Sequence, residues 1–316
     1  MSLYRWCGAL ALTMLLAAGN LFAQEPVTFR YKPEKGQKLI YRSTNDLTQT
    51  QNVMDMKIET RMTNESVSSR TVENVDDMGV AALKIKTELF KVKTKIGPLG
   101  EYNFDSKSSE REKGSVLGEA LTPIYERISG AEFEMFVSAR GEVKDVKGYA
   151  ELLADLIKDN PLAGQFTGGG SNAAAKISMQ SLFTVLNEKP VKVGDKWENP
   201  FDFDLPSVGK ARGKETVTYV GEDKVGDVKT AKFAVTTDMS FDVDVDVNGT
   251  KVTGQITTSN SSGTAQFDPA AGRLVSLKNS FTVGGQLNVA VNGMNIPIQQ
   301  DQTHTVSVEL LDKLPE

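Results

Sequence analysis

The sequence predicts a mainly β protein of the α+β type, with an antiparallel sheet in two duplicated halves and a few central helices. Three observations predict this fold class. Most of the chain alternates between apolar and polar residues, which is typical of half-buried strands. Two Asn-Gly pairs separate such alternating runs. Three short landmarks of the first half of the chain recur, in the same order, in the second half.

The alternation is clearest in two runs of the sequence. Residues 241–247 place Phe and Val on one face of a strand and Asp on the other. Residues 53–62 place four apolar side chains on one face and charged side chains on the other. The four apolar residues are Met54, Met56, Ile58 and Met62.

The Asn-Gly pairs predict two hairpins. Asn248-Gly249 and Asn292-Gly293 each stand between two alternating runs. Asn and Gly tolerate the positive φ angles that a tight type I′ turn requires, so each pair predicts a two-residue turn. Pro297 follows the second pair and has no N–H for a strand partner, so its strand is predicted to lie at a sheet edge or a bulge.

Helical spacing occurs only between about residues 115 and 187. It predicts helices over 115–129, 149–158 and 173–186, with a Gly-rich connector at 164–172 between the second and the third.

The duplication depends on three pairs of segments. Lys35–Leu39 is echoed by Val193–Trp197, 71–75 by 216–220, and 136–143 by 267–274. The sequence therefore divides into a signal peptide at 1–23, a first β half with helices at 24–161, a connector and helix at 162–187, and a second β half at 188–316.

The amino terminus predicts export. Arg5 precedes a short apolar run, and a small residue, Ala23, stands at the expected cleavage point, which is the pattern of a secretory signal peptide. The apolar run is shorter than the ~20 residues that a membrane span requires. Cleavage there removes Cys7, so we expect a cysteine-free, soluble chain in the periplasm or outside the cell.

The composition excludes several kinds of site. The chain has 316 residues with one Cys and one His, which excludes most zinc sites, Cys/His nucleophiles and Ser-His-Asp triads. His304 is expected to be an ordinary surface residue of a strand. Residues 244–249 match the start of a calcium loop, but Gln255 stands where the bidentate Glu should be, so a hairpin is the preferred interpretation. No catalytic, metal or cofactor-binding residue is predicted, and the chain is expected not to be an enzyme.

Four motifs resemble a known family. They are the strand entry Lys35–Leu39, the segment Ser129–Phe133, the turn Gly141–Val143 and the segment Pro190–Trp197. Residues from about 29 onward resemble a family of secreted bacterial β-rich proteins of unknown function. The broad shape is also similar to the lipoprotein carriers LolA, LolB and LppX, which implies a curved, half-barrel-like antiparallel sheet closed by helices.

These observations lead to a functional hypothesis with two alternatives. The chain is expected to be an exported, non-catalytic binding protein that carries a lipid or other hydrophobic ligand in the cell envelope. Met54, Met56, Ile58 and Met62 are the candidates for lining that ligand, although an ordinary sheet core is the preferred interpretation of the methionines. The main alternative is a structural or protein-interaction module of the envelope with an envelope protein as its partner, and a remote one is a carboxylate-only hydrolase. Neither a nucleic-acid partner nor a membrane span is expected.

Overall fold

The computed structural model describes residues 25–54, 56–111, 115–152, 172–205, 209–247, 250–291 and 293–315. The predicted signal peptide lies outside the described residues, and so does the Gly-rich connector up to residue 171. Of the helix predicted at 149–158, only residues 149–152 are described, and they are helical.

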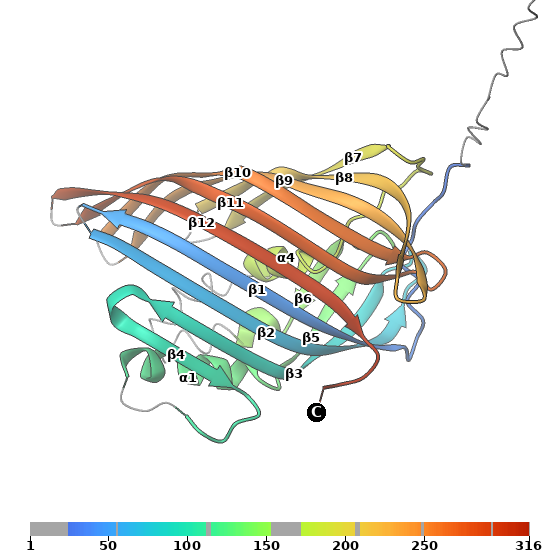
Figure 1. The fold of residues 1–316 in the computed structure, drawn as a ribbon, viewed down its shortest axis with the longest axis horizontal. Coiled ribbons are helices and arrows are strands. Elements are labelled where there is room, and N and C mark those ends of the chain that lie inside the picture. Colours follow the sequence, from blue (N-terminus) through green and yellow to red (C-terminus); the bar gives the residue numbers. More distant parts are fainter. Residues whose placement is uncertain are drawn as a thin grey trace, which may run out of the picture.

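Twelve strands form one antiparallel sheet (Figure 1). They are β1 (Lys38–Val53), β2 (Met56–Val75), β3 (Ala81–Ile96), β4 (Gly100–Asp105), β5 (Glu132–Val137), β6 (Val143–Lys147), β7 (Lys196–Leu205), β8 (Gly209–Val225), β9 (Val228–Val247), β10 (Thr250–Asp268), β11 (Arg273–Val291) and β12 (Met294–Leu311). Their order across the sheet is β6-β5-β3-β2-β1-β12-β11-β10-β9-β8-β7, and β4 pairs with β3. The strands at the two ends of this order, β6 and β7, do not pair, so the sheet is not closed.

The helices lie on the concave side of this sheet. Those whose full range is described are α1 (Val116–Ile128) and α4 (Asn172–Gln180), and a short 3-10 turn, η1 (Gly97–Leu99), follows β3. Helix α4 contacts both β6 and β7, and α1 contacts β3 and β4. Figure 1 shows the strands curling around these helices. The prediction of a mainly β, curved, half-barrel-like sheet with few helices is confirmed.

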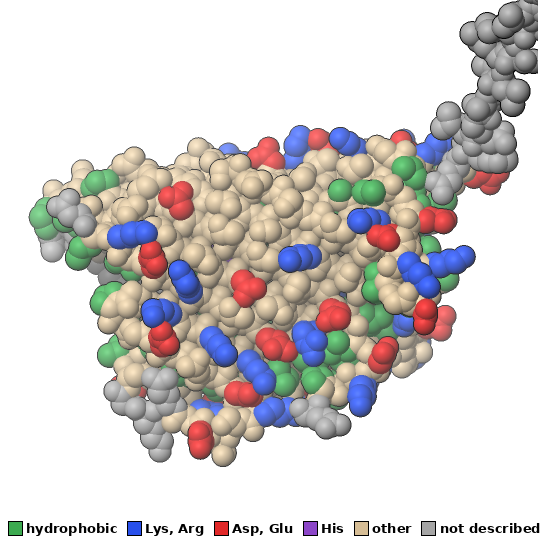
Figure 2. All heavy atoms as spheres, viewed as in Figure 1, with side chains coloured by type: hydrophobic (Ala, Val, Ile, Leu, Met, Phe, Trp, Pro, Cys, Tyr) green, Lys and Arg blue, Asp and Glu red, His purple; other side chains and the backbone are tan. Residues whose placement is uncertain are grey.

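The two faces of the sheet differ in chemistry because the strands alternate. Phe233 lies in register between Tyr219 of β8 and Ala265 of β10, and all three are buried on the concave side. Asp242 lies on the other face, where it accepts a hydrogen bond from Arg212. Figure 2 views this convex face and shows acidic and basic side chains mixed among uncharged polar ones. No described helix is long and apolar enough to cross a membrane.

The strands of both predicted hairpins pair with each other, while Asn248, Gly249 and Asn292 of the predicted turns lie outside the described residues. The prediction for Pro297 is wrong. Strands β9 and β10 pair from Val247 opposite Thr250, and β12 pairs with β11 on one side and β1 on the other. The strand with Pro297 is therefore central. It tolerates a proline because β1 ends with Val53 opposite Ile298, so on that side Pro297 has no strand neighbour that needs its N–H.

The run 53–62 is not one strand. Strand β1 ends at Val53, Met54 occupies a turn with φ 54°, and β2 begins at Met56. Val53 and Met56 are opposite each other in register, so they share a face. The apolar-polar alternation continues through the turn, which is why the sequence pattern conceals it.

The first predicted helix is confirmed, and the third is shorter than predicted. Helix α1 begins after Ser115, whose side chain accepts a hydrogen bond from the N–H of Gly118. Helix α4 ends at Gln180 instead of residue 186. The Gln180 side chain bonds the backbone of Gly141 and Val143, and the chain then turns out of the helix. This change of direction places Phe183 and Leu186 in the core.

The two halves share a turn geometry that agrees with duplication. The N–H of Gly36 donates to the carbonyl of Val72 (2.8 Å), and the N–H of Val72 donates to the carbonyl of Gln37 (2.9 Å). In the second half, Gly194 donates to Tyr219 (2.8 Å), and Tyr219 donates to Asp195 (3.0 Å). The equivalent of Val72 is thus Tyr219, two residues beyond the pairing of 71–75 with 216–220. The exact domain boundaries remain a prediction.

Candidate functional site

A cavity of about 280 Å³ lies between the concave face of the sheet and the helical side of the molecule. Its volume is close to the lower end of the ~300–1,000 Å³ typical of small-molecule sites. The sheet side of the cavity is polar. It is formed by alternate inward residues of β1 and β2, which include Asn45, Asn64, Ser66, Ser68 and Arg70.

The remaining lining is mostly apolar, and part of it comes from the neighbouring strands β3 and β5 of the same sheet. Phe133 and Met135 come from β5, Phe90 from β3, and Met179 and Leu182 from α4 and the turn that follows it. One part of the lining therefore offers hydrogen-bonding groups and one charge, and the neighbouring part offers hydrocarbon. An amphiphilic molecule matches both walls, whereas a purely apolar one would leave the polar wall without partners.

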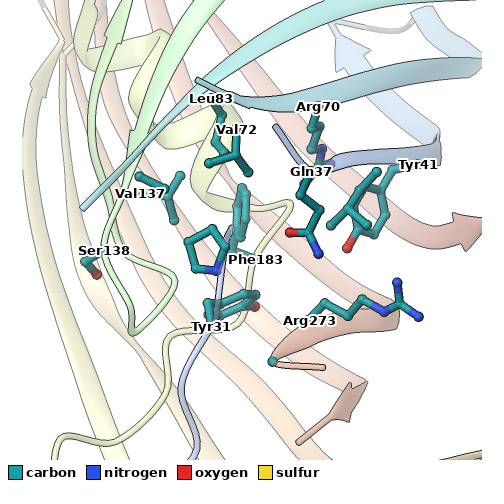
Figure 3. Close-up of a pocket in the computed structure, with 14 residues that line it drawn as sticks. Tyr31, Gln37, Tyr41, Arg70, Val72, Leu83, Val137, Ser138, Phe183 and Arg273 are labelled. Atoms are coloured by element: carbon teal, nitrogen blue, oxygen red, sulfur yellow. The ribbon is translucent and has the colours of Figure 1, made fainter. Parts of the chain in front are cut away.

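Arg70 is the residue common to this cavity and a smaller one of about 50 Å³ (Figure 3). Its side chain is 96 % buried, since only 4 % of its surface is exposed. The guanidinium lies over the ring of Tyr41, 4.1 Å from the centroid, and 5.1 Å from the centroid of Phe183. Stacking of this kind holds the cation by its faces.

No described residue neutralises this cation. Arg70 forms none of the ion pairs among the described residues, and its buried Nη2 has no hydrogen-bond partner there. Burial raises the pKa of Tyr31 and of Tyr41, so neither phenol supplies a negative charge. Burial also lowers the pKa of Arg70, but an arginine guanidinium keeps its proton in proteins.

A second buried polar group in the cavity lacks a partner. The Oδ1 atom of Asn45 has no hydrogen bond among the described residues, and Asn45 lies opposite Asn64 in the register of β1 and β2. Buried polar atoms have hydrogen-bond partners in the great majority of cases. It is therefore unusual that two residues of one cavity, Arg70 and Asn45, each have a buried polar atom without a described partner.

The residues predicted to line a ligand lie elsewhere. Met62 and Ile58 are half-buried, and Met62 packs on the cluster around α1. Met54 and Met56 are 67 % and 63 % exposed at the tip of the β1–β2 hairpin. None of the four is among the residues lining the 280 Å³ cavity. Their role in ligand binding stays a prediction.

Sequence reasoning missed Arg70, although a signal was present. Arg70 is in phase with Met56, Ile58 and Met62 along the same strand, at even positions. The apolar-polar alternation that predicts an inner face for these residues also predicts it for Arg70, and a cation on an inner face is unusual.

Replacement of both Met54 and Met56 by Gln is expected to change the free energy of unfolding by less than about 0.5 kcal/mol, because exposed side chains contribute little to packing. Urea denaturation of the double variant measures this difference. A loss of several kcal/mol would mean that these side chains are buried in solution, for instance against another molecule.

Glu215 is a second unusual group on the concave face. It accepts a hydrogen bond from Asn199 Nδ2 (3.4 Å), and Asn199 also donates to the carbonyl of Val185 (3.2 Å). Burial is the main cause that raises the pKa of Glu215 to about 7, and the bonds from Asn199 and the backbone of Val185 partly oppose the rise.

This pKa predicts a pH dependence of stability. An unfolded glutamate ionises near pH 4.5, while the folded Glu215 keeps its proton up to about pH 7. Stability therefore falls as pH rises between these values, and is lowest above them. Glu215→Gln is expected to stabilise the protein at pH 8 by up to about 3 kcal/mol, at ~1.4 kcal/mol per pKa unit, and to have little effect at pH 4.

Thermal and urea unfolding from pH 4 to pH 8 test this expectation. Glu222→Gln, an exposed change on the same strand, is the control and should leave the pH profile unchanged. Equal profiles for wild type and Glu215→Gln would contradict the raised pKa.

His304 is half-buried and not on the surface as expected. Its ring stacks on Phe281 with centroids 4.9 Å apart, and its Nε2 lies 3.1 Å from Oε1 of Gln302. Burial lowers the pKa of this imidazole. His304 is therefore a packing residue of the neighbouring strands β11 and β12.

The profile of a family of unknown function, DUF6263, matches residues 78–272 of the chain. No curated protein sequence matches it. Lipovitellin, in a structure described as showing lipid–protein interactions, is similar with a TM-score of 0.40 and 10 % identity over 90 % of this chain. The chain spans about a quarter (26 %) of lipovitellin.

Two further solved structures are similar at lower scores. The β domain of the Bordetella autotransporter BrkA has a TM-score of 0.22 at 8 % identity, over 87 % of this chain and 99 % of its own. Pseudomonas aeruginosa OccK5 has a TM-score of 0.21 at 7 % identity, over 89 % of this chain and 100 % of its own. The expected likeness to LolA, LolB and LppX is not confirmed by these comparisons.

Proposed function

The chain belongs to DUF6263, a family of unknown function, and we propose that it is an exported, non-catalytic binding protein. In this proposal it carries a hydrophobic ligand in the cell envelope. The cavity of about 280 Å³ beside α4 supports this proposal most directly. Export is proposed from the signal-peptide pattern of residues 1–23.

The construction of the cavity suits carriage of a ligand. Its apolar wall comes partly from α4 and the turn after it, including Met179 and Leu182, and these are packed onto the sheet and not paired with it. The sheet wall is fixed by continuous pairing of β1 with β2 and β12. A paired sheet beside an apolar helical cover gives a preformed cavity for a ligand.

A protein-interaction role is the second candidate. Met54, Met56 and Met294 are exposed at the tips of the β1–β2 and β11–β12 hairpins, at one end of the sheet (Figure 1). Exposed methionines at a common edge suit contact with an apolar surface. This role does not require the cavity to hold a molecule, so the test below separates the two.

Native mass spectrometry of the protein purified from its own host tests the carrier role. We expect an additional mass that organic extraction removes. Ser66→Phe places a ring in the cavity from β2 and should remove most of the retained mass. Thr48→Phe adds the same ring at an exposed position of β1 and should leave the retained mass unchanged.

Two results would count against the carrier role. One is a wild-type protein without any extractable mass that also fails to bind a neutral apolar probe such as dodecanol. The other is equal retention by wild type and Ser66→Phe, which would place the ligand outside the cavity.

A further inference from the structure

Arg70 lines the cavity without an opposite charge among the described residues, and this indicates the chemistry of the ligand. The inference rests on the proposed carrier function. We propose that the ligand is a single-chain amphiphile with an oxyanion head group, and that Arg70 binds this head group while the chain lies against the apolar wall. The oxyanion is a carboxylate or a phosphate.

Arg70 is a buried cation without an opposite charge among the described residues. A charged side chain that is 96 % buried is ordinarily accompanied by an opposite charge, because burial removes it from water. The described carboxylates near β2 lie on the other face: Glu88, for example, bonds Ser69 and Lys38. The guanidinium therefore has a charge requirement that no described residue meets.

The guanidinium of Arg70 is held by aromatic rings. Tyr41 and Phe183 contact it through their rings, at 4.1 Å and 5.1 Å from their centroids. Ring contacts satisfy no N–H group, and the buried Nη2 has no hydrogen-bond partner among the described residues. Guanidinium N–H groups match the paired oxygens of a carboxylate or phosphate, which arginine binds through two parallel hydrogen bonds.

Polar side chains line the cavity near Arg70. Ser66 and Ser68 precede it at alternate positions of β2 and line the same cavity, and Oδ1 of Asn45 there has no hydrogen-bond partner among the described residues. Hydroxyls and an amide NH₂ are donors to an anion, and an Asn side chain can present either its oxygen or its nitrogen by rotation. The polar wall thus offers donors around one cation.

The volume of the cavity limits the size of the ligand. About 280 Å³ is near the lower limit for small-molecule sites, so one chain fits better than several. The apolar part of the lining, which includes Phe133, Met135 and Met179, lies beside the polar part, because Phe133 is in register with Ile85 and Ile85 with Arg70. A molecule with one polar end requires such an arrangement.

Calorimetric titration with three probes of equal chain length tests this inference. The probes are dodecanoate, dodecyl phosphate and the neutral dodecanol. Wild type is expected to bind at least one anion at least 10-fold more tightly than dodecanol, and the anion that wins identifies the head group. Arg70→Met should reduce the preference to less than 2-fold while binding of dodecanol persists.

Two variants control for structure. Arg70→Lys keeps the charge and should keep part of the preference. Arg70→Gln removes the charge but keeps a polar side chain, and it serves in place of Arg70→Met if that variant does not fold. Arg61→Gln removes an exposed cation from the other face of β2 and should bind all three probes like wild type. A lost preference in Arg61→Gln would assign the effect to net charge and overturn the role of Arg70.

The outcomes separate this inference from the proposed function. Equal binding of dodecanol and both anions by wild type would overturn the oxyanion inference and leave the carrier role standing. Failure of wild type to bind any of the three would overturn both. A preference for an anion that survives in Arg70→Met would place the head group elsewhere and overturn the inference.

Discussion

Phe233→Ala is expected to lower the free energy of unfolding by about 3–5 kcal/mol, the typical cost of removing a buried aromatic side chain. Phe233 has no exposed surface. Its ring centroid lies 5.2 Å from that of Phe29, 5.5 Å from Tyr219 and 5.8 Å from Trp197. The cost is high because Tyr219 and Trp197 belong to paired strands that cannot close the gap.

Urea denaturation followed by tryptophan fluorescence measures this loss, since Trp197 is one of the contacting rings. Val220→Ala, at an exposed position of β8, is the control and should stay within about 0.5 kcal/mol of wild type. A loss below about 1 kcal/mol for Phe233→Ala would mean that this cluster does not form the core of the sheet.

The extent of the sheet follows from local patterns, and its order does not. Period two identifies the strands, and the Asn-Gly pairs identify two hairpins. The central place of β12 depends on its pairing with β1, nearly the whole chain away, for example Tyr41 with Leu310. No local signal records a contact of that sequence separation, and Pro297 pointed to an edge because the length of β1 was unknown.

The candidate site was less predictable than the fold. Its polar wall lies on β2 in phase with the methionine run, but residues 64–70 read as an ordinary polar strand because their cover is distant in the sequence. The apolar wall comes from β3, β5, α1 and the region of α4. Arg70 becomes notable only when burial and the absence of a described ion pair are known together, and neither is a property of the sequence alone.

Gly141→Ala is the second change with a large expected effect. Gly141 has φ +85°, which costs any residue with a Cβ about 1–2 kcal/mol. A Cβ built there would also lie 2.4 Å from Cε2 of Tyr31 and 2.8 Å from the carbonyl oxygen of Thr184. Tyr31 would have to move, and its hydroxyl would lose the bond to that carbonyl (3.3 Å). Overpacking of this kind typically adds about 1–3 kcal/mol.

Gly36→Ala separates the two causes, because Gly36 has nearly the same φ, +83°, and a Cβ there meets nothing within 4 Å. We expect Gly36→Ala to cost only the backbone part, about 1–2 kcal/mol, and Gly141→Ala to cost about 2–5 kcal/mol when the crowding is added. Equilibrium urea denaturation of the two variants measures the difference. Equal losses would mean that Tyr31 moves aside without a measurable cost in the free energy of unfolding.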